Sequence, residues 1–189
     1  MYWQPDAQGW FPAAIQRPSP NRDARPPGER PSLLVVHNIS LPPGVFGGRE
    51  VADLFLNLLD CDAHPWFDRL RGLRVSSHLL VLRSGAVLQF VSCHDRAWHA
   101  GRSSWAGRER CNDFSIGIEL EGTDDEPFTD AQYGRLEALT QGLRQVYPLA
   151  AAAGHSDIAP GRKTDPGPFF DWHRFTRLTG LPGPGPHGP

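Results

Sequence analysis

The sequence lacks several features that would assign it to a specialised class of protein. Its cysteines are Cys61, Cys93 and Cys111, an odd number with no CxxC pair, which argues against a disulfide framework and a thiolate zinc cluster. Neither sign of charge dominates, because 19 basic and 21 acidic residues give a net charge of -2. We therefore expect no nucleic-acid partner and no attraction to a charged membrane surface.

Two further absences concern membranes and export. The sequence contains no run of about 18 apolar residues, so it predicts no transmembrane helix. Its N-terminal stretch, MYWQPDAQGWFPAAIQRPSPN, has no basic segment followed by an apolar one and does not read as a secretory signal. From these two observations we expect a cytoplasmic protein.

The remaining composition is that of an ordinary globular protein. A length of 189 residues with 39% hydrophobic residues suits one domain that can bury its own core. We expect an irregular lead-in over residues 1–30, which are rich in proline, glycine and arginine. The folded domain is predicted over 31–178, followed by a Pro/Gly-rich, disordered tail over 179–189.

Apolar periodicity predicts a mixed α/β domain. Short apolar or alternating runs predict strands at 32–37, 78–82, 87–91 and 113–121. Helical spacing predicts helices at 50–59, 133–147 and 171–178, and residues 154–167 are expected to form a loop. Thr129 followed by Gln132 is a capping-box pattern at the start of the second helix. The order of these elements predicts a single domain with a central mixed β-sheet flanked by helices.

Three residues form a candidate zinc site. His37 ends an apolar strand, and His155 and Asp165 bracket a segment, HSDIAPGRKTD, that is poor in large apolar groups. Such a segment does not exist for packing, and an ordered loop can hold metal ligands. Imidazole and carboxylate suit zinc, and a catalytic zinc keeps three protein ligands and one open position. Because no HExxH or CxxC motif is present, these ligands must converge from distant segments.

Spacing alone leaves other possibilities open. The segment HDRAWH (94–99) carries two imidazoles and a carboxylate, although Arg96 within it disfavours a dication, and His64 and His78 are also available. A lone histidine at a strand end, such as His37, is more often a hydrogen-bonded structural residue. Cys111, which lies among charged residues, could be a nucleophile, but a free thiol is the simpler interpretation.

Two more residues have side chains that suit a hydrolytic zinc. Glu119 lies on the polar face of the strand at 113–121, where its carboxylate could take a proton from a zinc-bound water. For Glu121 we expect a surface position. Lys163, the one lysine of the sequence, lies two positions before Asp165 and could stabilise an oxyanion. A single lysine among many arginines hints at a role that arginine does not fill, such as proton exchange.

Four stretches carry a likeness to a known family. They are SLLVVHNISLPPGVFGG (32–48), DRAWHAGRSSWAGRERCNDFSIGIELEGTD (95–124), FTDAQY (128–133) and GHSDIAPGRKTDPGP (154–168). These stretches resemble the AmpD family of N-acetylmuramoyl-L-alanine amidases, and the likeness runs from about Arg17 to Phe175. The resemblance implies the fold shared by these amidases and the peptidoglycan-recognition proteins.

The resemblance also implies an activity. It assigns zinc to His37, His155 and Asp165, and catalysis to Glu119 and Lys163. The implied reaction cleaves the amide between the lactyl group of 1,6-anhydro-N-acetylmuramic acid and L-alanine in anhydro-muropeptides. The implied setting is peptidoglycan recycling in the cytoplasm, with a consequent role in limiting β-lactamase induction.

Further implications concern the substrate groove. Asn38, Arg74 and Arg110 would line it and meet the carboxylates of the peptide, and Trp98 would shape the wall on the sugar side. We expect a monomer. The chain departs from its relatives at Ser156-Asp157, where Cys-Asn is common, and the added carboxylate could alter the pH dependence.

Two competing functions fit the same resemblance. A non-catalytic peptidoglycan-binding module of this fold would typically have lost a metal ligand, whereas all three candidate ligands are present here. An exported amidase acting on intact cell wall would need a signal that the sequence as written does not carry. Activity on polymeric wall or only on soluble fragments would separate the exported enzyme from the recycling enzyme.

Overall fold

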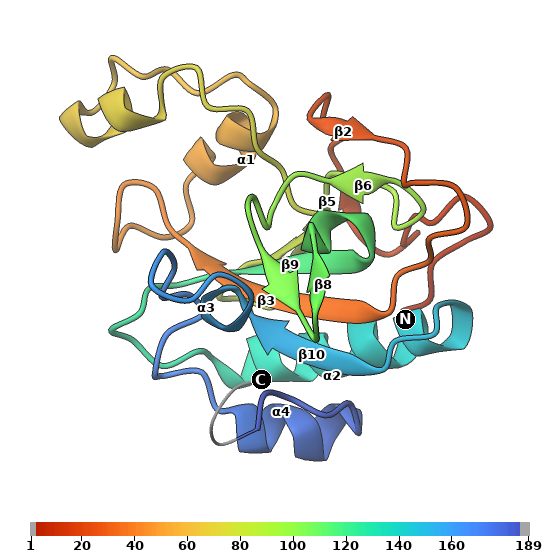
Figure 1. Ribbon diagram of the computed structural model, residues 1–189. Coiled ribbons are helices and arrows are strands. Elements are labelled where there is room, and N and C mark those ends of the chain that lie inside the picture. The colour runs from red at the N-terminus through yellow and green to blue at the C-terminus, as the bar shows by residue number, and fades with distance from the viewer. Residues whose placement is uncertain (1–2, 186–189) are drawn as a thin grey trace.

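The computed structural model describes residues 3–185, and its centre is a six-stranded mixed sheet in the order β1-β5-β4-β9-β3-β10 (Figure 1). The strands are β1 (Ile15–Gln16), β3 (Leu33–Ile39), β4 (Leu79–Val81), β5 (Val87–Gln89), β9 (Ser115–Glu121) and β10 (Ala151–Gly154). The strands from β4 to β10 in this order run parallel, and β4 and β5 form the predicted antiparallel hairpin. The predicted mixed α/β fold is confirmed.

The other elements are helices and short two-stranded pairs. The helices are α1 (Glu50–Phe55), α2 (Asp130–Val146), α3 (His155–Ile158) and α4 (Trp172–Thr179), with 3-10 turns η1 (Pro65–Leu70) and η2 (Cys111–Asp113). The pairs are β2 (Arg22–Asp23) with β6 (Arg96–Ala97), and β7 (Ser104–Trp105) with β8 (Arg108–Glu109). Within the described part of the chain, no helix is both long enough and apolar enough to cross a bilayer.

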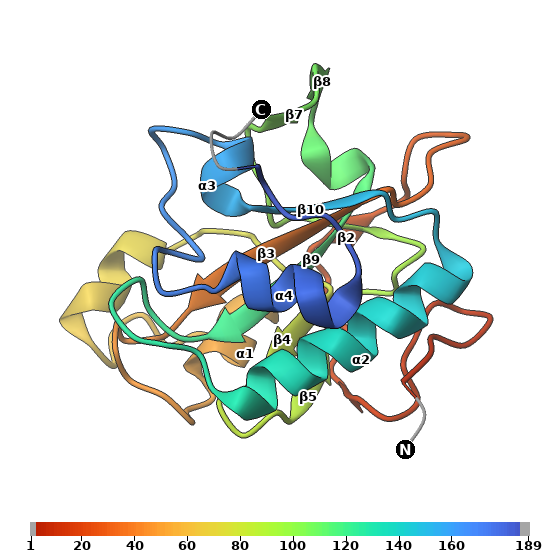
Figure 2. The same ribbon diagram turned by 90° about the horizontal axis from the view of Figure 1, so that it is seen from below.

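Helices α2 and α4 lie side by side against one face of the sheet (Figure 2). Ile116, Ile118 and Leu120 of β9 point into this core with apolar residues of both helices. The opposite face is covered by α1, η1 and the segment around η2, which build two smaller apolar clusters. Because both faces are covered, the central strands are buried throughout, as parallel strands usually are.

The second face of β9 is therefore not a surface. Glu121 is only 6% exposed, so its predicted surface position is wrong. Its carboxylate accepts hydrogen bonds from the backbone N–H groups of Gly47 and Arg83. Glu121 thus holds two loops at the end of the sheet.

Three segments differ from the expected elements. The first helix ends at Phe55, and Leu58, expected on its apolar face, is 63% exposed. The alanine run at 151–154 forms β10, because pairing with β3 overrides the weak strand propensity of alanine. Part of the predicted loop is the single turn α3, which begins at His155.

The predicted N-terminal lead-in and the predicted C-terminal tail both make ordered contacts with the rest of the structure. In the lead-in, β1 pairs with β5. In the predicted tail, Leu181 is buried and the Pro182 carbonyl accepts a hydrogen bond from Ala152 N at 2.7 Å. Residues 186–189 of that tail lie outside the described residues, and the domain division stays a prediction.

The predicted capping box at the start of α2 is confirmed. Thr129 Oγ1 accepts a hydrogen bond from Gln132 N at 3.1 Å, and Gln132 Oε1 accepts one from Thr129 N at 3.0 Å. Gln132 also donates to the backbone carbonyls of Val81 and Glu121. One buried amide thereby joins the helix start to β4 and β9.

We expect a Thr129→Ala variant to lower the free energy of unfolding by about 1–2 kcal/mol, because it removes the cap and the hydrogen bond from Thr129 Oγ1 to the Arg83 carbonyl. Urea unfolding followed by circular dichroism measures this. Thr129→Ser keeps the hydroxyl and is the control, expected to stay within about 0.5 kcal/mol of the wild type. Equal losses in both variants would contradict the capping account.

Candidate active site

Parallel pairing brings the predicted ligands to one edge of the sheet. In the register of β3 with β9, His37 lies opposite Glu119. In the register of β10 with β3, Gly154 lies opposite Val36, so His155, the next residue, comes beside His37. Asp165 returns to the same place because Ser156 N donates to its backbone carbonyl at 2.8 Å. The carboxyl ends of parallel strands commonly form sites in this way.

The three candidate ligand atoms lie in close contact with one another. His37 Nδ1 lies 3.0 Å from His155 Nδ1, and Asp165 Oδ2 lies 3.0 Å and 3.1 Å from these two nitrogens. Both histidines are buried, at 1% and 4% exposure. Within residues 3–185, this is the one set of three such side chains close enough to share a metal ion.

The rival histidines make other contacts. His64 caps η1 by accepting from Trp66 N, and His94 lies against Tyr147 Oη and the Ala7 carbonyl. His78 Nδ1 accepts from Gly117 N, and its other nitrogen contacts the Asp95 carbonyl at 3.1 Å. The 94–99 segment therefore does not converge on a metal, and only His99 of that segment reaches the three-residue group.

The chemistry of the donor set fits a metal ion. The Ala100 carbonyl can only accept a hydrogen bond, and it lies 3.1 Å from His155 Nε2, so that nitrogen carries the proton. His155 Nδ1 is then a bare lone pair facing the Asp165 carboxylate. Acceptors this close repel one another unless a cation lies between them. Two imidazoles and one carboxylate with an open position form a set typical of catalytic zinc.

The surroundings favour the ligand forms of these side chains. Burial, and then the neighbouring His155, lowers the pKa of His37 to about 4. Burial alone would raise the pKa of Asp165, but the adjacent imidazoles of His155 and His37 outweigh it and hold the pKa below its usual range. At neutral pH His37 is therefore a neutral imidazole and Asp165 a charged carboxylate, the forms in which these side chains bind metal.

Glu119 lies beside this group as a second carboxylate. It is 7% exposed, and its Oε1 lies 4.0 Å from His37 Nδ1. Its Oε2 is buried, and none of the described protein groups hydrogen-bonds to it. Burial, and then the charge of Asp165, raises the pKa of Glu119 well above its usual value. Glu119 is therefore a stronger proton acceptor than a solvated glutamate.

A cavity of about 490 Å³ opens above these residues. Its polar side carries the three-residue group and Glu119, while its other side is apolar and comes from β3, α1, η1 and the following loop. The apolar lining comprises Ile39, Leu41, Pro43, Leu54, Phe55, Trp66, Leu70, Leu73 and Val75. An amphipathic ligand with one polar, reactive end suits this division.

The remaining predicted site residues divide into two groups. Asn38, Trp98 and Lys163 line the cavity, and Lys163 is exposed at its rim. Arg74 lines a neighbouring hollow beside α1, and Arg110 lines another beside α3. The structure thus places both arginines outside the main cavity, and their role in binding stays a prediction.

Asn38 fixes two loops of the cavity wall. Its Nδ2 donates to Asp124 Oδ1 at 2.7 Å and to the Pro166 carbonyl at 3.1 Å. Sequence reasoning missed Asp124, which lines the cavity, because an acidic residue in the run TDDE reads as a solvated turn. It also missed Arg162, which donates to the Ala100 and Arg102 carbonyls.

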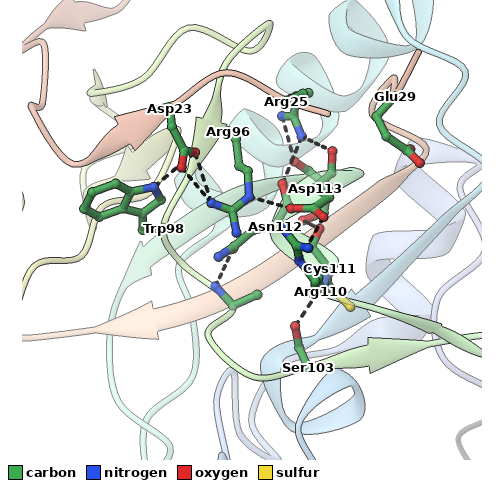
Figure 3. A network of polar contacts seen from close by, with 12 residues as sticks. Asp23, Arg25, Glu29, Arg96, Trp98, Ser103, Arg110, Cys111, Asn112 and Asp113 are labelled. Carbon is green, nitrogen blue, oxygen red and sulfur yellow. Dashed lines mark hydrogen bonds and ion pairs between the residues drawn. The ribbon is translucent and has the colours of Figure 1, made fainter. Parts of the chain in front are cut away.

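The Trp98 wall is held by ion pairs (Figure 3). Asp23 of β2 accepts from Trp98 Nε1 at 3.2 Å and from Arg96 at 3.0 Å. Arg96 also pairs with Asp113, which pairs with Arg110 at 3.2 Å. The N-terminal lead-in therefore supports one wall of the cavity through Asp23.

The unusual Ser156-Asp157 pair lies in α3. Asp157 Oδ2 accepts a hydrogen bond from Gly154 N at 2.6 Å, so this carboxylate turns back to cap the helix that carries His155. Burial raises the pKa of Asp157. Its side chain thus supports the turn that positions a metal-ligand candidate.

Comparisons with known proteins agree with this geometry. The family model described as N-acetylmuramoyl-L-alanine amidase matches residues 27–168. The 1,6-anhydro-N-acetylmuramyl-L-alanine amidase AmpD of Salmonella typhimurium is 58% identical over 176 residues, covering 92% of this chain and 94% of that protein. The AmpD protein of Escherichia coli is 58% identical over 173 residues, covering 90% and 94%.

Solved structures share the fold. A crystal structure of a selenomethionine AmpD derivative has a TM-score of 0.90 at 57% identity, covering 92% of this chain and 98% of that one. The Escherichia coli amidase AmiD, in complex with anhydro-N-acetylmuramic acid-L-Ala-D-γ-Glu-L-Lys, has a TM-score of 0.62 at 31% identity, covering 88% and 64%.

The fold and these relatives together define the class of protein as an amidase, a hydrolase of amide bonds. More specifically, the chain belongs to the N-acetylmuramoyl-L-alanine amidase family. The resemblance stated from the sequence is thereby confirmed, and the non-catalytic binding module is not favoured.

We expect His78 to make stability depend on pH. Burial, and then the charge of Arg25, lowers the pKa of His78 to about 3. Between about pH 6.5 and pH 3, His78 therefore binds a proton in the unfolded chain but not in the folded chain, and its contribution to stability falls as pH falls through that window. A His78→Asn variant should reduce the slope of unfolding free energy against pH by about 1.4 kcal/mol per unit. Urea titrations from pH 4 to 6 test this, and an unchanged slope would contradict it.

Proposed function

We propose that this amidase uses a zinc ion, held by His37, His155 and Asp165, to hydrolyse the amide between 1,6-anhydro-N-acetylmuramic acid and L-alanine in soluble anhydro-muropeptides. The observation that carries the proposal is the convergence of three metal-binding atoms within 3.1 Å beside the buried carboxylate of Glu119. The high identity to AmpD amidases along most of the chain supports the substrate.

Each polar residue has a distinct part in this proposal. Zinc, when bound, would polarise the amide carbonyl and acidify water. Glu119 takes the proton of the attacking water and passes it to the L-alanine nitrogen as the amide C–N bond breaks. The Lys163 ammonium stabilises negative charge on the carbonyl oxygen from the cavity rim.

The cavity walls account for substrate binding in the same proposal. Because Asn38 donates its amide hydrogens to Asp124 and Pro166, we expect it to offer the substrate its Oδ1 as an acceptor. The sugar lies against Trp98 and the apolar side of the cavity. Arg74 and Arg110, which lie outside this cavity, would meet only the outer carboxylates of the stem peptide by charge-assisted hydrogen bonds.

The direct test measures zinc and cleavage together. The purified protein is assayed for zinc per chain and incubated with anhydro-N-acetylmuramoyl-tripeptide, with mass spectrometry following release of the free tripeptide. We expect near-stoichiometric zinc and release that a chelator abolishes. Zinc without release would overturn the substrate assignment, and absence of both would overturn the assignment of His37, His155 and Asp165.

Glu119→Gln should lower turnover about 10²- to 10⁴-fold without loss of zinc, since the amide cannot accept the water's proton. Glu121→Gln is the matched control, because Glu121 lies two residues further along the strand and holds backbone N–H groups. The control should lose stability but keep most of its turnover.

Lys163→Ala, in the same assay, should lose about 10²-fold in turnover with zinc retained. Full activity in either catalytic variant would remove that residue from the mechanism.

The cellular setting stays part of the proposal. We predict a cytoplasmic monomer that acts in peptidoglycan recycling, and thereby limits β-lactamase induction. An exported amidase of the same fold is the alternative. Hydrolysis of polymeric sacculi at rates comparable to those on soluble anhydro-muropeptides would favour that alternative, and cell fractionation would locate the protein.

A further inference from the structure

A chain of hydrogen bonds leads from His37 away from the metal-binding group into the core. His37 Nε2 lies 2.9 Å from His99 Nδ1, and His99 Nε2 lies 3.1 Å from Ser115 Oγ. Ser115 Oγ donates to the Cys111 carbonyl at 2.6 Å. All of these side chains are buried, so water does not compete for their hydrogen bonds.

The direction of each hydrogen bond in this chain is fixed from its inner end. The Cys111 carbonyl can only accept, so the single Ser115 hydroxyl hydrogen points to it. Ser115 Oγ then accepts from His99, and His99 Nε2 carries a proton. The Nδ1 of neutral His99 is therefore an acceptor, and His37 Nε2 must be the protonated nitrogen that donates to it. His37 Nδ1 is left with a bare lone pair directed at His155 and Asp165.

We propose that His99 and Ser115 are positioning residues that hold His37 in its Nε2–H tautomer and so prepare its Nδ1 for the metal ion. The inference deepens the proposed function and rests on its zinc site. An imidazole that ligates a metal generally donates its other N–H to a nearby acceptor, which fixes the tautomer and the ring orientation. In this protein the acceptor is itself a histidine, and its own tautomer is set by a serine.

The surrounding structure holds the His99 ring in place. The ring lies against Gly117 of β9, where an added Cβ would come within 2.6 Å of His99 Cγ. Ser115, Gly117 and Glu119 lie on the same face of β9, because every second residue of a strand points to the same side. That face therefore supplies the acceptor for His99, the space for its ring, and the carboxylate beside the metal-binding group.

One short segment serves both metal-binding histidines. His99 contacts His37, and the carbonyl of the next residue, Ala100, accepts from His155 Nε2. Asn112 Oδ1 holds this segment by accepting from the backbone N–H groups of His99 and Ala100, at 3.2 Å and 2.8 Å. The segment thus fixes both imidazoles with their Nδ1 atoms directed at one point.

The test compares variants that remove or keep the acceptor. His99→Leu removes it, and His99→Asn keeps a side-chain oxygen close to the position of Nδ1. We expect His99→Leu to weaken zinc binding about 10- to 100-fold, measured by competition with a chromophoric chelator, and His99→Asn to recover most of that loss. Thr140→Val, the control, changes a fully buried polar residue of α2 on the other face of the sheet and should leave zinc affinity unchanged.

A spectroscopic readout separates this role from a general loss of structure. Long-range ¹H–¹⁵N correlation spectra of the zinc-free protein report which nitrogen of His37 is protonated. We expect Nε2–H in the wild type and a mixture of tautomers in His99→Leu. If that variant does not fold, Ser115→Ala, which removes one buried oxygen, should show the same mixing with a smaller loss of zinc affinity.

The outcomes distinguish this inference from the proposed function. A wild-type protein with the Nε2–H tautomer but no zinc affinity would overturn the proposed zinc site and leave the hydrogen-bond chain supported. Zinc binding that is equal in the wild type and His99→Leu, with an unchanged His37 tautomer, would overturn the inference alone. Protonation of His37 Nδ1 in the wild type would also overturn it.

Discussion

The parallel pairing of β3 with β9 and β10 is the constraint on which the site depends. It sets His37 opposite Glu119 and brings His155 beside His37, although these residues are far apart in the sequence. Since successive strand residues point to opposite faces, a slip of one residue would turn His37 towards α2 and into the apolar core. The apolar residues that alternate with the site residues therefore fix the register and, with it, the chemistry.

The two faces of β9 have different roles, because one packs in the apolar core and the other contributes to the site. One face carries Ile116, Ile118 and Leu120 into the main core under α2 and α4. The other face is also buried, but its residues are small or polar rather than apolar. Covering this second face buries His37 and Glu119, and this burial shifts the pKa values of the two side chains in opposite directions.

Hydrogen bonds from neighbouring residues support the segments that carry the candidate ligands. Asn112 holds the His99–Ala100 segment, Asp157 caps the turn that carries His155, and Asn38 ties together the loops at Asp124 and Pro166. Each of these bonds either joins segments that are separated in the sequence or caps the start of a short helix. A ligand set assembled from several loops needs such support, because small displacements of its members would spoil the geometry of the group.

Local sequence determined the elements whose causes are local. The capping pattern at Thr129 and the apolar periodicity after it were enough to place α2, and the run SLLVVH was enough to place β3. The quoted motifs also identified the family, and with it the candidate ligands. Tertiary structure alone decided the rest, because it depends on pairing between distant segments. It turned an alanine run into β10, buried Glu121 as a loop anchor, set Arg74 and Arg110 apart from the main cavity, and made His99 a partner of His37 rather than a rival ligand.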